Sequence, residues 1–232
     1  MLQGCCIFLT TAVYFATKLN IQTMKSLIFL LIVSVFLMYG CKQAKETKEN
    51  IELGQELKKA GENMQKAIEE GSKKMEARRA KGDTIPIHFD KLKDYLPKQV
   101  NNFTPDGQPE GQTVGAQGMS FSMTQQRYKS GNEELTIIIN DYNGVPSLFT
   151  MATAMIKANV TFENNEQSMK SLNMGIPDVG AMETYDKANK EAGILLGVGE
   201  RFLVKIQATN QKDTELVKSV AKLMPLSEMA AM

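Results

Sequence analysis

The chain has 232 residues, enough for one or two domains, and 23% of them are charged, with a formal net charge of +1. This near-neutral total combines two parts of opposite sign: residues 42–82 hold eleven Lys and Arg against eight Glu, whereas residues 83–232 hold fourteen against eighteen acidic residues. A mildly acidic domain without a basic stripe is poorly suited to nucleic-acid binding, which depends on neutralising phosphates, so we expect no nucleic-acid partner.

All three cysteines, Cys5, Cys6 and Cys41, lie near the amino terminus. Residues 42–232 can therefore form neither a disulfide framework nor a thiolate metal site. The single histidine, His88, also excludes a metal cluster built on imidazoles. We expect the domain to depend on its hydrophobic core for stability and to carry no metal or other cofactor.

The amino terminus has the three parts of a secretory signal. Lys25 supplies the positive charge, an apolar run extends from Leu27 to Met38, and a small residue precedes Cys41. The run is too short for a comfortable bilayer span. The sequence Met38-Tyr39-Gly40-Cys41, followed at once by a polar and charged stretch, resembles the lipobox of bacterial lipoproteins. The resemblance implies cleavage of a signal peptide, residues 24–40, and thioether attachment of diacylglycerol to the Cys41 sulfur.

Two features depart from the usual lipoprotein pattern. Lipoboxes commonly have Leu three residues before the cysteine and a small residue two before, where this chain has Met38 and Tyr39. An uncleaved signal anchor is therefore the alternative. Residues 1–23 add a second apolar stretch, which does not belong in front of a signal peptide. We interpret Met24 as the true start and residues 1–23 as an over-extended gene start, with a two-segment membrane anchor as the alternative.

The residue after Cys41 suggests which membrane would hold the lipid. Each buried methylene group contributes about 0.8 kcal/mol, so several acyl chains on one cysteine would anchor the protein durably. Lys42 follows the cysteine, and no Asp resembles the inner-membrane retention signal of enterobacteria. By this analogy we expect a cell-envelope lipoprotein anchored in the outer membrane, on its periplasmic or surface face.

Residues 41–82 are predicted to form the lipidated cysteine and a charged helical tether. The segment is rich in Lys, Glu, Gln and Ala, and apolar residues recur at steps of four and three. These are Leu53, Leu57, Ala60, Met64, Ala67 or Ile68, and Met75. The narrow stripe is typical of a weak coiled coil. The helix is either a solvated spacer or a segment, residues 51–78, through which copies or partners associate.

The predicted domain, residues 83–232, begins with a short helix and a long loop. A helix between Ile85 and Leu96 would place Phe89 and Leu92 on one face and end at Pro97. Residues 101–118 contain four Gly, two Pro and three Gln and are predicted to form a loop. A loop of this length is unusual in a compact domain, and long ordered loops often carry function.

Two strands and a helix follow. The first strand would place Met119, Phe121 and Met123 on one face, and the second, ending at Asp141, does the same for alternate apolar residues. These are Leu135, Ile137 and Ile139. A helix beginning at Pro146 follows the Asn143-Gly144 turn. Its apolar face would comprise Leu148, Phe149, Ala152, Met155 and Ile156.

The last third of the chain contains three further predicted strands and a helix. Residues 160–178 are ambiguous, residues 179–186, 194–198 and 202–208 read as strands, and Glu200-Arg201 is interpreted as a turn with a surface charge pair. Asp213 or Thr214 would cap the final helix. Its inward residues would be Leu216, Val217, Val220, Leu223 and Met224.

This order of elements, β-β-α-β-β-β-α, predicts an α+β fold with a mainly antiparallel sheet covered by two helices. The order is similar to that of PsbP-like envelope domains, in which helices pack on an antiparallel sheet. The resemblance is one of topology alone, and a fold does not determine a function.

The candidate site residues each have a structural alternative. Asp141, at a strand end, could act as a catalytic acid, but Asp before an Asn-Gly turn is ordinarily a turn former or helix cap. Arg127 and Tyr128 could grip an anion, and Met119 and Met123 could line an apolar groove for a lipid or peptide. His88 is interpreted as a packed or surface residue.

The leading hypothesis is a non-enzymatic, lipid-anchored envelope module. Its partners would be the membrane, through the lipid, and either another envelope protein or a small apolar ligand. The first alternative is a structural or assembly factor that forms a homo-oligomer through residues 51–78. The second is a carboxylate-dependent enzyme centred on Asp141.

Overall fold

The computed structural model describes residues 49–116 and 118–232. The predictions for residues 1–23, for the signal peptide and for Cys41 lie outside these residues. The chain divides into two compact units, residues 1–51 and 52–232, and the architecture below belongs to the second. None of the described helices is both long enough and apolar enough to span a membrane.

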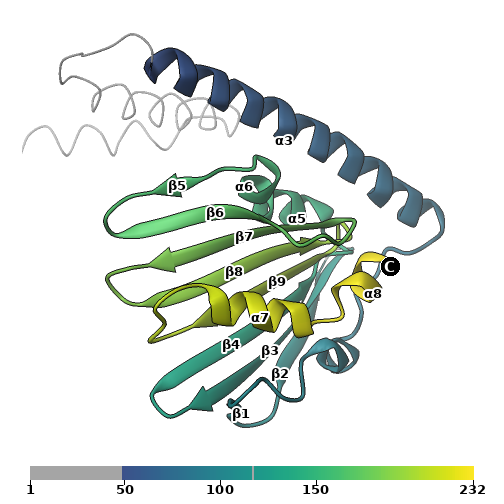
Figure 1. Cartoon of the computed structure of the whole chain (residues 1–232). Coiled ribbons are helices and arrows are strands. Elements are labelled where there is room, and N and C mark those ends of the chain that lie inside the picture. The colour runs from purple at the N-terminus through teal and green to yellow at the C-terminus, as the bar shows by residue number, and fades with distance from the viewer. Residues whose placement is uncertain (1–48, 117) are drawn as a thin grey trace, which may run out of the picture. The chain divides into compact units, whose positions relative to one another are not determined.

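Nine strands of the described residues form one antiparallel sheet (Figure 1). The strand order is β1-β3-β4-β9-β8-β7-β6-β5, and β2 also pairs with β3. The strands are β1 (Thr104–Pro105), β2 (Glu110–Ala116), β3 (Met119–Ser130), β4 (Glu133–Asp141), β5 (Phe162–Glu163), β6 (Gln167–Asn173), β7 (Val179–Asp186), β8 (Glu191–Val198) and β9 (Phe202–Ala208). With the helices below, this confirms the predicted α+β class and its mainly antiparallel sheet.

The predicted loop at residues 101–118 is wrong, because it contains β1 and β2. Gly, Pro and Gln give this segment a loop-like composition, but the long strand β3 offers it a partner. β2 pairs with the first half of β3, from Met119 to Gln125, and β1 pairs near its other end, at Tyr128 and Lys129. The ambiguous residues 160–178 contain β5 and β6.

One face of the sheet carries the main hydrophobic core. Helices α7 (Glu215–Leu223) and α8 (Leu226–Ala230) cover this face, and Figure 1 shows α7 lying across the strands. The predicted inward residues of β4 are confirmed, since Leu135, Ile137 and Ile139 are fully buried. Of the two predicted caps of α7, Thr214 stands at the N-cap position but makes no capping bond, whereas the Asp213 carboxylate accepts a hydrogen bond from the Glu215 N–H at 2.9 Å. Leu223, predicted to point inward, is half exposed.

The opposite face is covered in part by α5 (Pro146–Ala152) and α6 (Ala154–Lys157). Phe149 and Ile156 are buried as predicted, whereas Leu148 and Met155 are exposed, and the single predicted helix is divided at Thr153. A Cβ on Gly197 would lie 2.9 Å from the Thr153 methyl group, so glycine in β8 lets these helices approach the sheet closely.

Two shorter helical segments and one long helix precede the sheet. The predicted helix at residues 85–96 is shorter than expected: α4 (Phe89–Leu92) continues directly into the 3-10 turn η1 (Lys93–Tyr95). The tether forms α3 (Glu49–Ala80), as its composition predicts. The carboxyl-terminal half of α3 contacts its own domain: Gly71 lies against the Glu200 side chain, and Lys74 pairs with Asp178. The sequence did not predict this contact, and the roles of residues 51–78 as a spacer or as an association segment both stay predictions.

Candidate functional site

The buried face of β3 is polar. Ser122, Thr124 and Gln126 alternate along it and are all buried. The Ser122 hydroxyl lies 2.8 Å from the Thr113 hydroxyl, and the Thr124 hydroxyl donates to the carbonyl of Glu110 at 2.9 Å. These side chains tie β2 to β3 across their shared ladder.

Sequence reasoning missed this polar row. Met119, Phe121 and Met123 do share a face, but it is the face opposite the main core, since their neighbours Ser122 and Thr124 point to the α7 side. The detectable signal was a hydroxyl or amide at every second position beside a glycine-rich segment. Such groups are well placed to bond to the backbone of a neighbouring strand.

A cavity of about 510 Å³ lies at the end of this row. Its size falls within the range of about 300–1,000 Å³ that is typical of small-molecule sites. Its walls are the segment after α4 and the turn between β1 and β2, and its lining residues are Lys93, Asp94, Leu96, Pro97, Lys98, Pro105, Gly107, Gln108, Pro109, Gln126 and Tyr128. Three of these are prolines, whose fixed φ angles limit movement of the walls.

Gln126 leaves one polar atom without a partner beside this cavity. Its side chain is 4% exposed, and its Nε2 donates to the carbonyls of Arg127 at 2.7 Å and Gly107 at 3.2 Å. Because both partners are acceptors, the amide orientation is determined and Oε1 is the free end. No donor among the described residues reaches that oxygen. This oxygen is open to the cavity, where water or an N–H or O–H group of a ligand can donate to it.

Tyr128 supports one wall of the cavity. Its hydroxyl donates to the carbonyl of Pro97 at 2.5 Å. Burial raises the pKa of Tyr128 to about 12, so the phenol remains a protonated donor across the physiological range. This contact fixes the distance between β3 and the segment that follows η1.

The other predicted ligand-binding residues lie away from the cavity. Arg127 follows the strand alternation to the opposite face, where it is exposed and lies 3.5 Å from Glu110. Met119 is 57% exposed and Met123 is half-buried on that same face. Of the predicted set, the structure brings only Tyr128 to the cavity. Ligand binding by the others stays a prediction.

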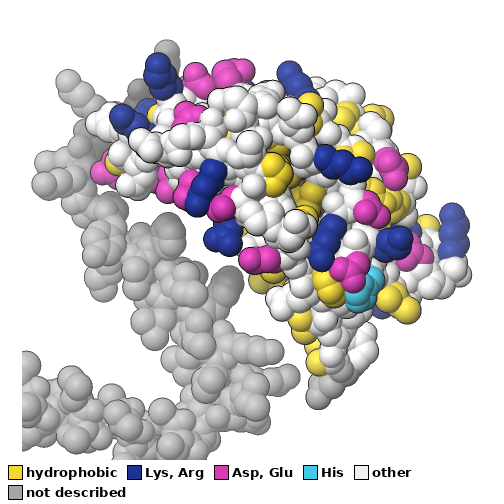
Figure 2. All heavy atoms as spheres, turned by 90° about the horizontal axis from the view of Figure 1, so that it is seen from below, with side chains coloured by type: hydrophobic (Ala, Val, Ile, Leu, Met, Phe, Trp, Pro, Cys, Tyr) yellow, Lys and Arg dark blue, Asp and Glu magenta, His cyan; other side chains and the backbone are white. Residues whose placement is uncertain are grey.

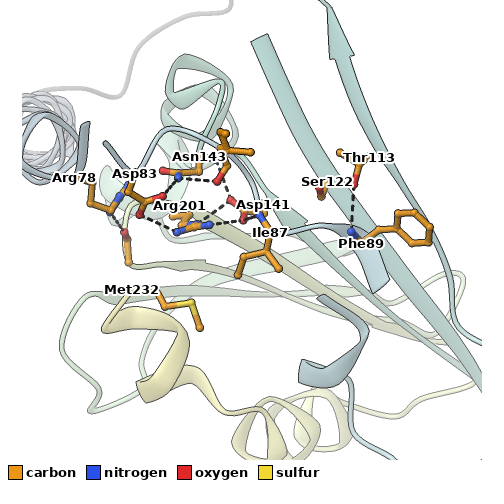
Figure 3. A network of polar contacts seen from close by, with 12 residues as sticks. Arg78, Asp83, Ile87, Phe89, Thr113, Ser122, Asp141, Asn143, Arg201 and Met232 are labelled. Carbon is orange, nitrogen blue, oxygen red and sulfur yellow. Dashed lines mark hydrogen bonds and ion pairs between the residues drawn. The ribbon is translucent and has the colours of Figure 1, made fainter. Parts of the chain in front are cut away.

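Asp141 is the centre of a second buried polar cluster (Figure 3). Its side chain is fully buried, and both carboxylate oxygens accept two hydrogen bonds each. Oδ1 accepts from the Asn143 N–H at 2.9 Å and Arg201 Nε at 3.0 Å, and Oδ2 accepts from the Ile87 N–H at 2.7 Å and Arg201 NH2 at 2.8 Å. The bidentate contact with Arg201 compensates the buried charge.

The same cluster holds the segment that leads into the domain. Arg201 also lies 3.2 Å from Asp83, and the Asn143 amide donates to Asp83 at 2.6 Å. At the end of α3, Arg78 donates to the carbonyls of Gly199 and Glu200 at 2.7 and 2.8 Å. Burial, together with the nearby Arg201, lowers the pKa of Arg78. The cluster therefore fastens residues 78–87 to the ends of β4 and β9.

The surroundings of Glu200, Arg201 and Asp141 differ from those of a surface charge pair and of a catalytic acid. Glu200-Arg201 is a turn, but its charges do not form a surface pair: Arg201 is 5% exposed and binds Asp141, while Glu200 lies 2.6 Å from Lys157. The Asp141 oxygens are engaged by four donors, so neither is free to exchange protons with a substrate. The arrangement fits the turn-forming interpretation of Asp141 better than a catalytic one.

The remaining charged groups do not assemble into a metal centre. Within residues 49–116 and 118–232 no three His, Cys, Asp or Glu side chains are grouped as metal ligands. His88 is exposed and its ring lies 4.4 Å from that of Phe89. On the face seen in Figure 2, basic and acidic side chains are interleaved around the histidine, and hydrophobic side chains lie among them.

Comparison with known proteins does not place the chain in a family. No family model matches it, and no curated protein does. A crystal structure of an uncharacterized protein from Mycobacterium smegmatis, the Rv0999 ortholog, aligns with 59% of this chain and 94% of its own length, at 8% identity and a TM-score of 0.29. A likeness at this level carries no argument about fold or function.

Proposed function

We propose that this protein is a cell-envelope lipoprotein, anchored through Cys41, whose domain is a non-enzymatic binding module with its ligand held in the cavity beside Gln126. The observation that carries the binding part is Gln126 Oε1, which accepts no hydrogen bond from the described residues and is open to a cavity of about 510 Å³. A polar atom in this position determines the orientation of a ligand, and the mixed polar and apolar walls supply the remaining contacts.

The lining defines the chemical class of the ligand. Its inner end needs an N–H or O–H donor for Gln126, and its body must suit the flat apolar surfaces of Leu96, Pro97 and Pro105. The lining also includes Lys93, Lys98 and Asp94, so both signs of charge are present. A small, partly apolar molecule with one donor group meets these conditions, as does a side chain presented by another envelope protein.

The anchor is supported by the signal-like run that ends at Gly40-Cys41. A metabolic label tests it: cells expressing the full chain are fed an alkyne fatty acid, and the purified protein is examined for the label. We expect labelling of the wild type and of Cys6→Ser, and its loss in Cys41→Ser. Equal labelling of all three proteins, or of none, would contradict the anchor.

The binding site is tested by native mass spectrometry of the full chain extracted from its host membranes. We expect a bound mass in the wild type that disappears in Gln126→Met, which removes the acceptor and nearly preserves the volume. Gln125→Met is the matched control, because the Gln125 amide lies on the same strand but points to the opposite face, near Glu110. A bound mass that persists in Gln126→Met would exclude this cavity as the site.

The two alternative functions receive less support. An assembly role for residues 51–78 would compete with the contacts that α3 makes to Asp178 and Glu200. A carboxylate enzyme centred on Asp141 would have to release that side chain from Arg201. We therefore favour the binding module.

A further inference from the structure

Strand β2 (Glu110–Ala116) presents a free edge of the sheet. In the ladder, Glu110, Gln112 and Val114 pair with odd-numbered residues of β3. The Asp106 N–H donates to the Arg127 carbonyl, so odd-numbered residues of β3 direct their backbone N–H and C=O groups toward β1 and β2. By the alternation of an antiparallel ladder, the intervening residues of β2 point their N–H and C=O groups outward. These residues are Gly111, Thr113 and Gly115. No backbone partner within the described residues takes up those groups.

Beyond Glu110 this edge lacks the charges and prolines that protect most edge strands, although Phe89 packs against Gly111 and its N–H donates to the Thr113 hydroxyl. Edge strands of natural proteins are normally short, charged, or interrupted by proline or a bulge. Residues 111–126, which include most of β2 and the hairpin into β3, contain no charged residue at all in a chain that is 23% charged. Val114, on the exposed surface of β2, is 41% exposed.

The other edge of the same sheet shows the contrast. There the outermost strand, β5, has only two residues. Its Glu163 lies 3.0 Å from Lys170 and 3.1 Å from Lys187, so charged side chains surround the edge. An incoming strand would meet charged side chains at β5, and at β2 the Phe89 side chain beside Gly111.

The sequence of β2 is complementary to itself. In an antiparallel pair centred on Thr113, Thr113 lies opposite Thr113 of the second copy, Gly111 lies opposite Gly115, and Glu110 lies opposite Ala116. Outward-pointing residues then face one another, as a hydrogen-bonded pair requires. The only charged residue of the strand meets an alanine, so no like charges are brought together.

We propose that β2 pairs with β2 of a second copy of this chain, joining two sheets edge to edge. Seven residues a side make a smaller contact than the roughly 800 Å² per partner of a standard interface. The pairing therefore depends on confinement of both copies to one membrane, which raises their effective concentration. That dependence rests on the proposed lipid anchor, whereas the pairing register does not.

Disulfide trapping on membranes tests the register. One tagged copy of the full chain carries Gln112→Cys and a second copy carries Val114→Cys, positions that face each other only in the proposed pair. A control pair places the cysteines at Gln167→Cys and Asn173→Cys, exposed ends of β6 near the opposite edge. We expect an oxidant to give a dimer carrying both tags from the first pair, at least fivefold above the control. Equal yields, or no dimer, would overturn the proposal.

A backbone variant shows whether the outward groups are used. Gly115→Pro removes an outward N–H and leaves the ladder to β3 intact, and a Cβ at Gly115 meets no atom closer than 3.7 Å. We expect Gly115→Pro in both copies to reduce the dimer at least fivefold and the matched Gly115→Ala to leave it unchanged. A conjugate with another protein in place of the dimer would assign the edge to a different partner and overturn self-pairing.

The anchor and the pairing can fail separately. Repeating the trapping with Cys41→Ser in both copies is expected to reduce the dimer, because the membrane no longer confines the chains. An undiminished dimer would overturn the membrane dependence and leave the register standing. Loss of fatty-acid labelling with retained trapping would defeat the anchor alone, and the Gln126→Met result is independent of both.

Discussion

The domain contains two buried polar regions that differ in how completely they are satisfied. Around Asp141, four donors saturate one carboxylate, and Arg201 neutralises its charge. Along β3, the row ends at Gln126, whose amide nitrogen is bonded twice while its oxygen meets a cavity. The Asp141 carboxylate has no capacity left for a further donor, although Arg78 Nε in the same cluster is buried without a partner, so the role of the carboxylate is to hold the chain together. The Gln126 oxygen, which lines a cavity, has such capacity, and this difference directs the functional proposal to Gln126 and away from Asp141.

The largest expected effect comes from breaking the saturated cluster. Arg201→Met leaves the Asp141 carboxylate buried without its counter-charge, and loss of one partner of a buried pair typically costs about 3–5 kcal/mol. Urea unfolding followed by circular dichroism measures the change. The double variant Arg201→Met with Asp141→Leu is expected to regain part of the stability, because the unpaired charge is gone. A loss below about 1 kcal/mol in the single variant would show that the cluster does not hold the domain together.

A smaller effect is expected at the cavity wall. Tyr128→Phe removes the hydrogen bond to Pro97 and should cost about 1–2 kcal/mol near neutral pH, because a buried carbonyl loses its donor. The pKa of Tyr128 is raised to about 12 in the folded protein, above its ordinary value of 10. The folded state therefore holds the proton more tightly, and the contribution present below pH 10 is lost as the pH rises through 12.

The measurement for Tyr128 is the difference in unfolding free energy between the wild type and Tyr128→Phe, at pH 8 and at pH 11. We expect this difference to shrink at the higher pH. Other groups that titrate in this range, including Tyr95 and Tyr142, are common to both proteins and cancel. A difference that stays constant or grows with pH would mean that the phenol is not a protonated donor in the folded state.

Substitution of Gln126 should destabilise the folded domain less than substitution of Arg201. Gln126→Met loses the two bonds from Nε2, but the Arg127 carbonyl keeps its bond from the Asp106 N–H, so only part of the local bonding is lost. We expect the free energy of unfolding, measured without ligand, to change by less than about 1 kcal/mol. A loss as large as that of Arg201→Met would place Gln126 with the structural residues, and the cavity would lose its main support as a binding site.

The contrast between the Asp141 cluster and the polar row of β3 also shows which features could be predicted from the sequence. Regular alternation of apolar residues identified β4, and the Asp213 cap with its apolar periodicity identified α7, because both signals are local. The burial of Ser122, Thr124 and Gln126 could not be predicted in the same way. It depends on the position of β2, which forms a strand only because β3 has a free edge to offer.

The Asp141 cluster shows a second limit of the sequence. Asp141 was recognisable as a turn former before Asn143-Gly144, but its main partner, Arg201, lies 60 residues away. Nothing in the spacing of Glu200-Arg201 distinguishes a buried guanidinium from an exposed one. The partner became identifiable only when the sheet order placed β9 beside β4.

The smallest effect is expected at Arg127, the neighbour of both Gln126 and Tyr128 in sequence but not in environment. Its ion pair with Glu110 spans 3.5 Å, and both side chains are more than half exposed. Such pairs contribute about 0–1 kcal/mol, so Arg127→Met should leave the unfolding midpoint in urea nearly unchanged. It should also leave the bound mass seen by native mass spectrometry in place, because Arg127 points away from the cavity. If Arg127→Met instead abolished binding while Gln126→Met did not, the ligand would occupy the exposed face shared with Met123. The difference in hydrogen bonding between Asp141 and Gln126 would then no longer indicate where the ligand binds.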